Sequence, residues 1–223
     1  MKKLFYYASI ILAMVMTVSV FTACGDDDED DSTKDNRVKS VVPDKYRTLL
    51  EEYIPIYDGV NPPNVEGVFL SSPTILVYSS DGKFSAGHQF ADKYYRFSNQ
   101  NSKNNTIDYE SVQSSEKCIG DGAFISGSDN NFTIYFNLNG TSGTATFKEA
   151  LVLSGTKTSE GIKNLEYAFV MLEKNDPDKK MMAEGVYRII KDGDAFSPYA
   201  EWPAGKSRAA AEPIIEELET SAK

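Results

Sequence analysis

The sequence has 223 residues, with 33 acidic and 23 basic side chains and a formal net charge of −10. An acidic chain without a basic stripe argues against nucleic acid as a partner, because that partner needs clustered lysine and arginine. A single histidine excludes a histidine-rich metal site, and two cysteines, one of them near the N-terminus, leave little basis for disulfides.

The N-terminal residues have the pattern of an export signal. Residues 1–3 are basic, and residues 4–20 are almost wholly apolar. Small residues and Cys24 close this run where a signal would be cut, which favours cleavage over a retained membrane helix. We therefore predict a signal peptide over residues 1–23.

The residues Phe21-Thr22-Ala23-Cys24 resemble the lipobox of bacterial lipoproteins, with Phe21 where leucine is typical. The resemblance implies cleavage before Cys24 and acylation of that cysteine as the new first residue. Acyl chains contribute about 0.8 kcal/mol per buried methylene, so several chains on one cysteine give a stable anchor. Cys24 is thus the predicted lipid attachment site, and the membrane is a partner through this anchor only. Cys118 is then the one remaining cysteine, so no intramolecular disulfide is expected.

An acidic run follows the cysteine: Asp26, Asp27, Asp28, Glu29, Asp30 and Asp31. Adjacent carboxylates repel one another and offer nothing to bury, so residues 24–43 are predicted to be an extended tether. The position of the run directly after the lipobox is similar to the export signal of surface-exposed lipoproteins in Bacteroidetes. That resemblance implies an outer-membrane lipoprotein exposed at the cell surface.

Residues 44–53 predict a short amphipathic helix at the start of the folded domain. The apolar and aromatic residues fall at helical spacing: Tyr46, Leu49, Leu50 and Tyr53. Asp44 is a suitable N-cap, and Pro55 follows the helix. Further prolines up to Pro63 exclude both helix and central strand in the connector.

Strand-like runs joined by turn sequences then continue to residue 191, with no helix between them. They cover residues 65–80, 88–98, 106–114, 117–126, 131–139, 144–156, 165–174 and 185–191. The run 131–139 alternates most clearly, with Phe132, Ile134, Phe136 and Leu138 on one face. Ser71-Ser72-Pro73 interrupts the first run and predicts a bulge or a tight corner there.

Neighbouring antiparallel strands in sequence order predict a mainly β domain over residues 44–223. We expect a closed up-and-down β-barrel of about eight strands, because closure removes the exposed edges; a two-sheet β-sandwich is the alternative. A barrel of this size is filled by side chains or holds one small ligand. Gly67-Val68-Phe69 is similar to the Gly-x-Trp opening of lipocalin-type barrels, which implies that Phe69 plugs the closed end.

The strand pattern ends at a C-terminal tail. The turn Asp192-Gly193-Asp194 leads to an aromatic segment at 196–202, and residues 209–220 predict a helix interrupted by Pro213. Aromatic rings stack on sugars and line apolar pockets. Tyr199 and Trp202, in the non-strand segment, are therefore the ligand-binding candidates.

The chain contains no recognised catalytic motif, so we predict no enzyme activity, no cofactor and no metal. His88 is expected at a rim or on the surface, and Cys118 as a small buried residue. Asp108 and Glu110 share a strand face, as two glycosidase carboxylates could, but a solvated outer face explains them more simply.

These observations predict a non-catalytic, lipid-anchored binding module for a small apolar molecule or a glycan. The alternative is a structural or interaction subunit of an outer-membrane protein complex, with an exposed apolar patch and no sizeable pocket. A hydrolase is the third possibility, and it requires paired carboxylates or His88 in a cleft.

Overall fold

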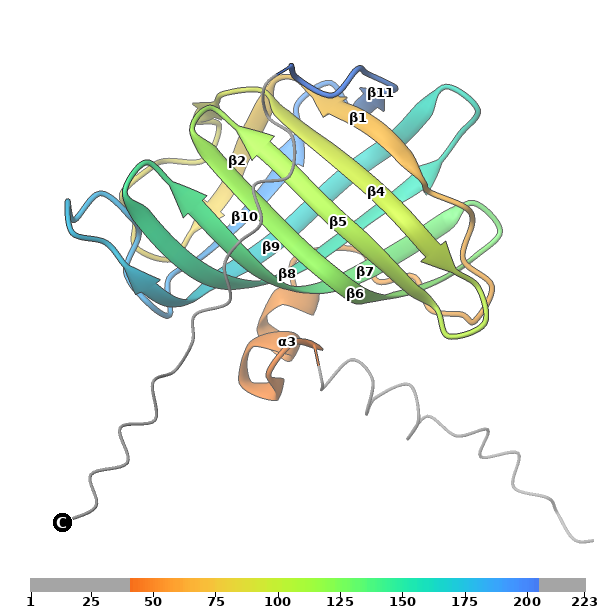
Figure 1. Ribbon diagram of the computed structural model, residues 1–223, viewed down its shortest axis with the longest axis horizontal. Helices are drawn as coiled ribbons and strands as arrows, with labels where there is room; N and C mark the ends of the chain where they lie inside the picture. The colour runs from red at the N-terminus through yellow and green to blue at the C-terminus, as the bar shows by residue number, and fades with distance from the viewer. Residues whose placement is uncertain (1–40, 205–223) are drawn as a thin grey trace, which may run out of the picture. The chain divides into compact units, whose positions relative to one another are not determined.

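The strands of the domain form a closed antiparallel β-barrel with one short helix outside it (Figure 1). A computed structural model describes residues 41–204, apart from the side chains at positions 121 and 122. The elements are α3 (Asp44–Glu51), β1 (Gly67–Ser71), β2 (Thr74–Ser79), β3 (Gln89–Phe90), β4 (Lys93–Asn101), β5 (Thr106–Gln113), β6 (Glu116–Ser128), β7 (Asn131–Ser142), β8 (Ala145–Lys157), β9 (Gly161–Asn175), β10 (Tyr187–Asp192) and β11 (Phe196–Pro198). The predicted barrel is confirmed, and the sandwich alternative is wrong.

The barrel closes through its first strand, which turns a corner at Ser72-Pro73. Before the corner, β1 pairs with β4, and after it, β2 pairs with β10. From β4 to β10 the strands pair in sequence order, while β3 pairs antiparallel with β2 and β11 pairs with β9. With β1 and β2 counted as one strand, the described residues form the predicted barrel of eight strands.

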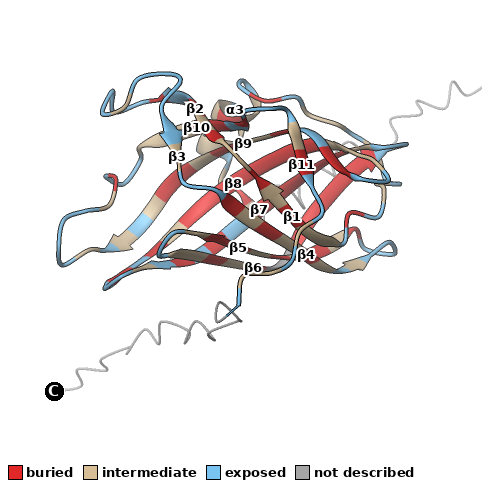
Figure 2. Ribbon diagram, turned by 90° about the horizontal axis from the view of Figure 1, so that it is seen from above, coloured by how far each residue is buried: buried red, intermediate tan, exposed pale blue. Residues whose placement is uncertain are grey.

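The inward faces of the strands carry apolar and aromatic side chains that fill much of the barrel. Figure 2 shows in red the buried residues along the strands. In β7, the four residues predicted to share a face are all fully buried: Phe132, Ile134, Phe136 and Leu138. The buried Phe69 ring lies 6.0 Å from the Phe97 ring and 4.8 Å from the Tyr199 ring, centre to centre. Each fully buried side chain of this kind contributes about 1.5–3 kcal/mol, so this part of the interior is a conventional core.

A second apolar cluster lies on the outer face of the barrel, under α3. Leu50 of the helix packs with residues of β6 to β10, among them Tyr135, Ala150, Val152 and Ala168. This cover explains why β8 is buried on both of its faces around Val152. Val42 belongs to the same cluster and is fully buried, although the tether is predicted to extend to residue 43.

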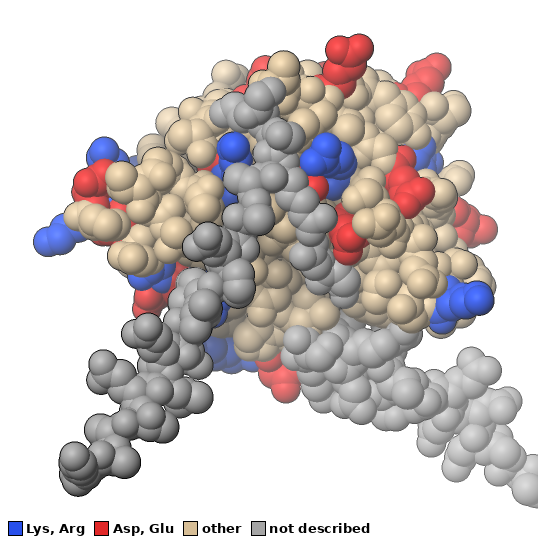
Figure 3. Space-filling model, viewed as in Figure 1, with Lys and Arg blue, Asp and Glu red and all other residues tan. Residues whose placement is uncertain are grey.

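Several predicted segments lie outside the described residues. They are the signal peptide at 1–23, most of the tether with Cys24 and Asp26 to Asp31, and the C-terminal helix at 209–220. In residues 41–204, no helix is long and apolar enough to cross a membrane. On the face shown in Figure 3, acidic and basic side chains are interspersed among other residues.

Candidate functional site

A cavity of about 260 Å³ lies at one end of the barrel, beside the loops that follow β2 and β9. At the liquid volume of water, this space equals roughly nine water molecules. Its apolar walls come from both loops and strands, and include Phe84, Phe90, Phe147, Phe169, Met171 and Ile190. The barrel is therefore filled at Phe69 and hollow at this end.

Lys93 lies in the wall of this cavity with only 3% of its surface exposed. Lys93, Tyr95 and Phe97 are spaced two residues apart on β4, so their side chains point to the same face. Tyr95 and Phe97 belong to the core, and Lys93 therefore also points into the barrel. Its Nζ lies 3.8 Å from Glu116 Oε1 and 4.9 Å from the centre of the Tyr167 ring. Burial disfavours the ammonium, but Tyr167, Tyr109 and Glu116 outweigh it and hold the pKa of Lys93 well above its ordinary value.

Glu149 is the second buried ionisable group in the cavity wall, and it is also 3% exposed. The Cys118 thiol donates a long hydrogen bond of 3.7 Å to Glu149 Oε1. Burial, and then the nearby Glu116 carboxylate, raise the pKa of Glu149 to about 8, although Lys93 opposes the shift. Glu149 is therefore mostly a neutral carboxylic acid at pH 7, with an O–H group that can donate a hydrogen bond.

Three buried tyrosines surround the lysine: Tyr95, Tyr109 and Tyr167. Burial raises the pKa of each phenol, so all three stay neutral at physiological pH. The Tyr95 hydroxyl lies close to the Tyr167 hydroxyl, and the Tyr109 hydroxyl lies close to Ser111, but neither contact has normal hydrogen-bond geometry.

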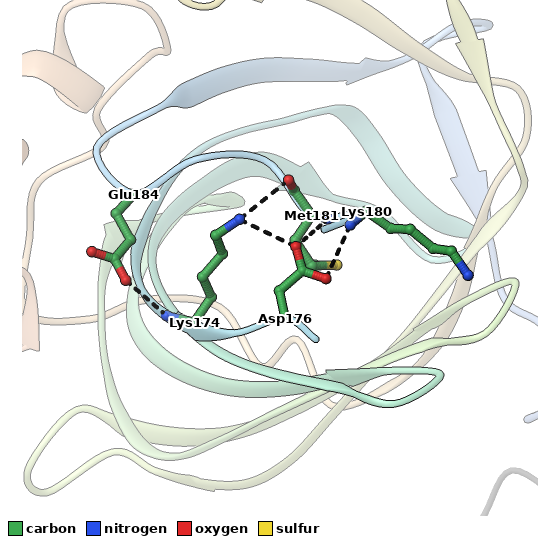
Figure 4. A network of polar contacts seen from close by, with 5 residues as sticks. All are labelled: Lys174, Asp176, Lys180, Met181 and Glu184. Carbon is green, nitrogen blue, oxygen red and sulfur yellow. Dashed lines mark hydrogen bonds and ion pairs between the residues drawn. The ribbon is translucent and has the colours of Figure 1, made fainter. Parts of the chain in front are cut away.

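The loop between β9 and β10 covers the cavity and is held by Asp176 (Figure 4). Its Oδ1 accepts the Lys180 amide at 3.0 Å, and its Oδ2 accepts the Met181 amide at 2.9 Å. Lys174 Nζ donates to Asp176 Oδ2 at 3.2 Å, while the Lys174 amide donates to Glu184 Oε1 at 3.2 Å. Burial opposes ionisation of Asp176, but the Met181 and Lys180 amides and the Lys174 ammonium outweigh burial and lower the pKa of Asp176. The ionised side chain therefore fixes the loop that presents Met181 to the cavity.

The other side of the mouth is formed by an aromatic cluster in the loop after β2. The exposed His88 ring stacks on Phe84 at 4.4 Å and meets Phe90 edge-on at 4.8 Å. Arg188 lies over the Phe84 ring at 5.1 Å and pairs with Asp81 at 3.7 Å. His88 is exposed, as predicted for a rim or surface residue.

The two aromatic residues predicted to bind a ligand lie elsewhere and do not line the cavity. Tyr199 is 47% exposed, packs on Phe69, and has Lys157 Nζ 4.8 Å from its ring centre. Trp202 is half-buried, with the Arg96 guanidinium 4.4 Å from its ring centre. A ligand-binding role for Tyr199 and Trp202 stays a prediction.

The other sequence candidates occupy structural positions. Glu110 pairs with Arg96 on the outer face, where Asp108 accepts a hydrogen bond from Asn99 at 2.7 Å. Cys118 is buried as predicted, and burial together with Glu149 and Glu116 raises the pKa of its thiol. Asp192 is buried at the end of β10 and accepts a hydrogen bond from the Ser197 hydroxyl. Within the described part of the chain, no three potential ligands are arranged to hold a metal ion.

The cavity residues Lys93, Glu116 and Glu149 are absent from the sequence-based candidates. Their spacing from apolar residues in the same strand is the signal that could have identified them. Lys93 is two residues from Tyr95, and Glu149 is two residues from both Phe147 and Leu151. Because side chains two residues apart in a strand point to the same face, both charged side chains fall on inward faces. A charged residue in phase with a strand's apolar face indicates a buried site.

No family model, curated protein or solved structure matches this chain.

Proposed function

We propose that the protein is a lipid-anchored binding module of the outer-membrane surface, which holds a small, largely apolar ligand in the barrel. The observation that carries this proposal is the cavity of about 260 Å³ in a barrel whose other end is filled around Phe69. Ligand sites in proteins are typically concave and apolar, with a few placed polar groups. The aromatic and methionine walls and the buried Lys93 and Glu149 fit that description.

The N-terminal sequence supports the anchor and the location. Cys24 in its lipobox-like context would carry the acyl chains, and the acidic run after it would direct the protein to the cell surface. A protein held in this way needs no other membrane contact. Binding without catalysis is supported by His88, which contacts two phenylalanine rings at the exposed rim.

The binding proposal is tested by titrating 1-octanol into the purified chain and measuring the heat of binding. We expect saturable binding that Met181→Trp weakens at least tenfold, because the larger ring occupies the mouth of the cavity. Ala183→Trp is the matched control, since Ala183 is exposed in the same loop and does not line the cavity. Absence of binding, or equal affinity in both variants, would contradict the proposal.

An interaction subunit of an outer-membrane complex is the second candidate, and one surface feature favours it. The rings of Tyr53, Tyr78 and Tyr187 gather on the outside of the barrel, with Tyr53 and Tyr78 stacked at 5.7 Å. Tyr53, Val77 and Tyr78 are among the exposed large hydrophobic residues, and exposed apolar patches commonly mark contact surfaces. A negative octanol titration would favour this second function.

A further inference from the structure

Lys93 is a buried cation whose ion pair is long. Its ammonium has three N–H groups, and the 3.8 Å between Nζ and Glu116 Oε1 exceeds the length of a hydrogen bond. Glu116 is its one ion-pair partner among the described residues, and the Glu116 side chain is 30% exposed. A buried charge requires pairing and hydrogen bonding, so an additional anionic oxygen beside Nζ would satisfy the site.

Glu149 adds a second donor to the same wall rather than an acceptor. Its only hydrogen bond to a described residue comes from the Cys118 thiol, which is a weak donor. In its neutral form the carboxyl group presents an O–H to the cavity. The site therefore offers an ammonium and a hydroxyl donor, which together suit a carboxylate.

The charges around the cavity favour an anion as well. Four cationic side chains line it, namely Lys83, Lys93, Lys180 and Arg188. Asp178 and Asp81 pair with Lys180 and Arg188, which leaves Lys83 and Lys93 against the Glu116 carboxylate, since Glu149 is mostly neutral at pH 7. A cationic head group would meet this excess of like charge, and a neutral one would leave the Lys93 charge without a second partner. Neither head group would form the charge-assisted hydrogen bond with Lys93 that a carboxylate forms.

We propose that the cavity selects a medium-chain amphiphile whose carboxylate binds Lys93 Nζ and whose acyl tail contacts Phe147, Phe169 and Met171. This inference rests on the proposed binding function and adds the head-group chemistry of the ligand. The size of the cavity, equal to roughly nine water molecules, suits an eight-carbon chain.

The test compares three ligands of equal chain length on the purified full chain: octanoate, 1-octanol and octylammonium. Isothermal titration calorimetry at pH 7 and low salt gives each dissociation constant. We expect octanoate to bind at least tenfold more tightly than 1-octanol, and octylammonium to bind most weakly. This comparison needs no variant, so it decides the inference even if a substitution prevents folding.

A substitution then assigns the effect to Lys93. Lys93→Met keeps most of the side-chain volume and removes the charge, so octanoate should bind no more tightly than 1-octanol. The readout is the ratio of the two affinities, because a change in the shape of the cavity affects both ligands alike. Lys163→Met is the matched control, because Lys163 is exposed on β9, and it should change neither affinity.

The outcomes separate the two proposals. If none of the three ligands binds, the cavity is not a ligand site and both proposals fail. If 1-octanol binds as tightly as octanoate, or octylammonium binds most tightly, the head-group inference is overturned while the binding function stands. If Lys93→Met leaves the preference for octanoate intact, the role of Lys93 is overturned.

Discussion

At the scale of single residues, Glu149 makes folding depend on pH. The pKa of this carboxyl group is about 8 in the folded protein, against an ordinary value of 4.5. Between these values the folded state binds more protons than the unfolded state, so stability falls as pH rises. The stabilising effect of the neutral acid is complete below about pH 4.5 and is lost as pH rises through about 8.

Glu149→Gln should therefore stabilise the protein at alkaline pH, because the amide keeps the shape and cannot ionise. We expect its free energy of unfolding at pH 9 to exceed that of the parent by at least about 2 kcal/mol, with the gain shrinking towards pH 4.5. Urea unfolding at pH 4.5, 7 and 9 measures it. Glu160→Gln is the control, since Glu160 is exposed. Parallel pH profiles for the parent and Glu149→Gln would show that Glu149 is not the titrating group.

The sequence contains the information that places these charges. A lysine or glutamate in a strand is normally assigned to solvent, because charged side chains are rarely fully buried without a partner. The two-residue spacing between Lys93 and Tyr95, and between Phe147 and Glu149, instead places both charged side chains on the inward face. The distance of 3.8 Å between Lys93 and Glu116 was beyond prediction, because it depends on the register between β4, β5 and β6.

At the scale of elements, the loop between β9 and β10 depends on one carboxylate. Asp176→Ala removes the acceptor of the Lys180 and Met181 amides, so we expect both amides to exchange their hydrogens at least tenfold faster. Hydrogen exchange followed by nuclear magnetic resonance at pH 7 measures this directly.

Asp178→Ala is the matched control for that loop. The Asp178 carboxylate accepts hydrogen bonds only from the side chains of Thr144 and Lys180, at 3.1 and 3.4 Å, among the described residues. Its removal should leave the exchange of both backbone amides unchanged. Equal acceleration in the two variants would mean that Asp176 does not specifically hold the loop.

Strand positions are the part of the fold that local sequence predicts well. Alternation in β7 identifies its inward face, because a strand sends successive side chains to opposite sides. Tyr135 lies on the opposite face of β7, and it is buried there because α3 covers that side of the barrel. The separate partners of β1 and β2 were also beyond prediction, since pairing across the chain leaves no mark on the local pattern of residues 65–80.

At the scale of the whole molecule, the anchor can be tested apart from the barrel. Cys24→Ser should abolish incorporation of an alkyne-labelled palmitate and release the protein from the membrane fraction. Cys118→Ser should retain both, because Cys118 is 1% exposed inside the barrel and is not available for acylation in the folded protein. Label that persists in Cys24→Ser would contradict the lipoprotein proposal.

The seam between β2 and β10 governs the order in which the chain can complete its structure. Thr74 pairs with Asp192, so the two sides of the seam are separated by almost the whole barrel sequence. Because synthesis starts at the N-terminus, β2 is made early and has no partner until β10, the last strand of the barrel, has been made. Contacts of such long range slow folding, and an unpaired strand edge can pair with another chain. Until Asp192 pairs with Thr74, the edge of β2 can pair with another chain, so we expect incomplete chains to aggregate more readily than complete ones.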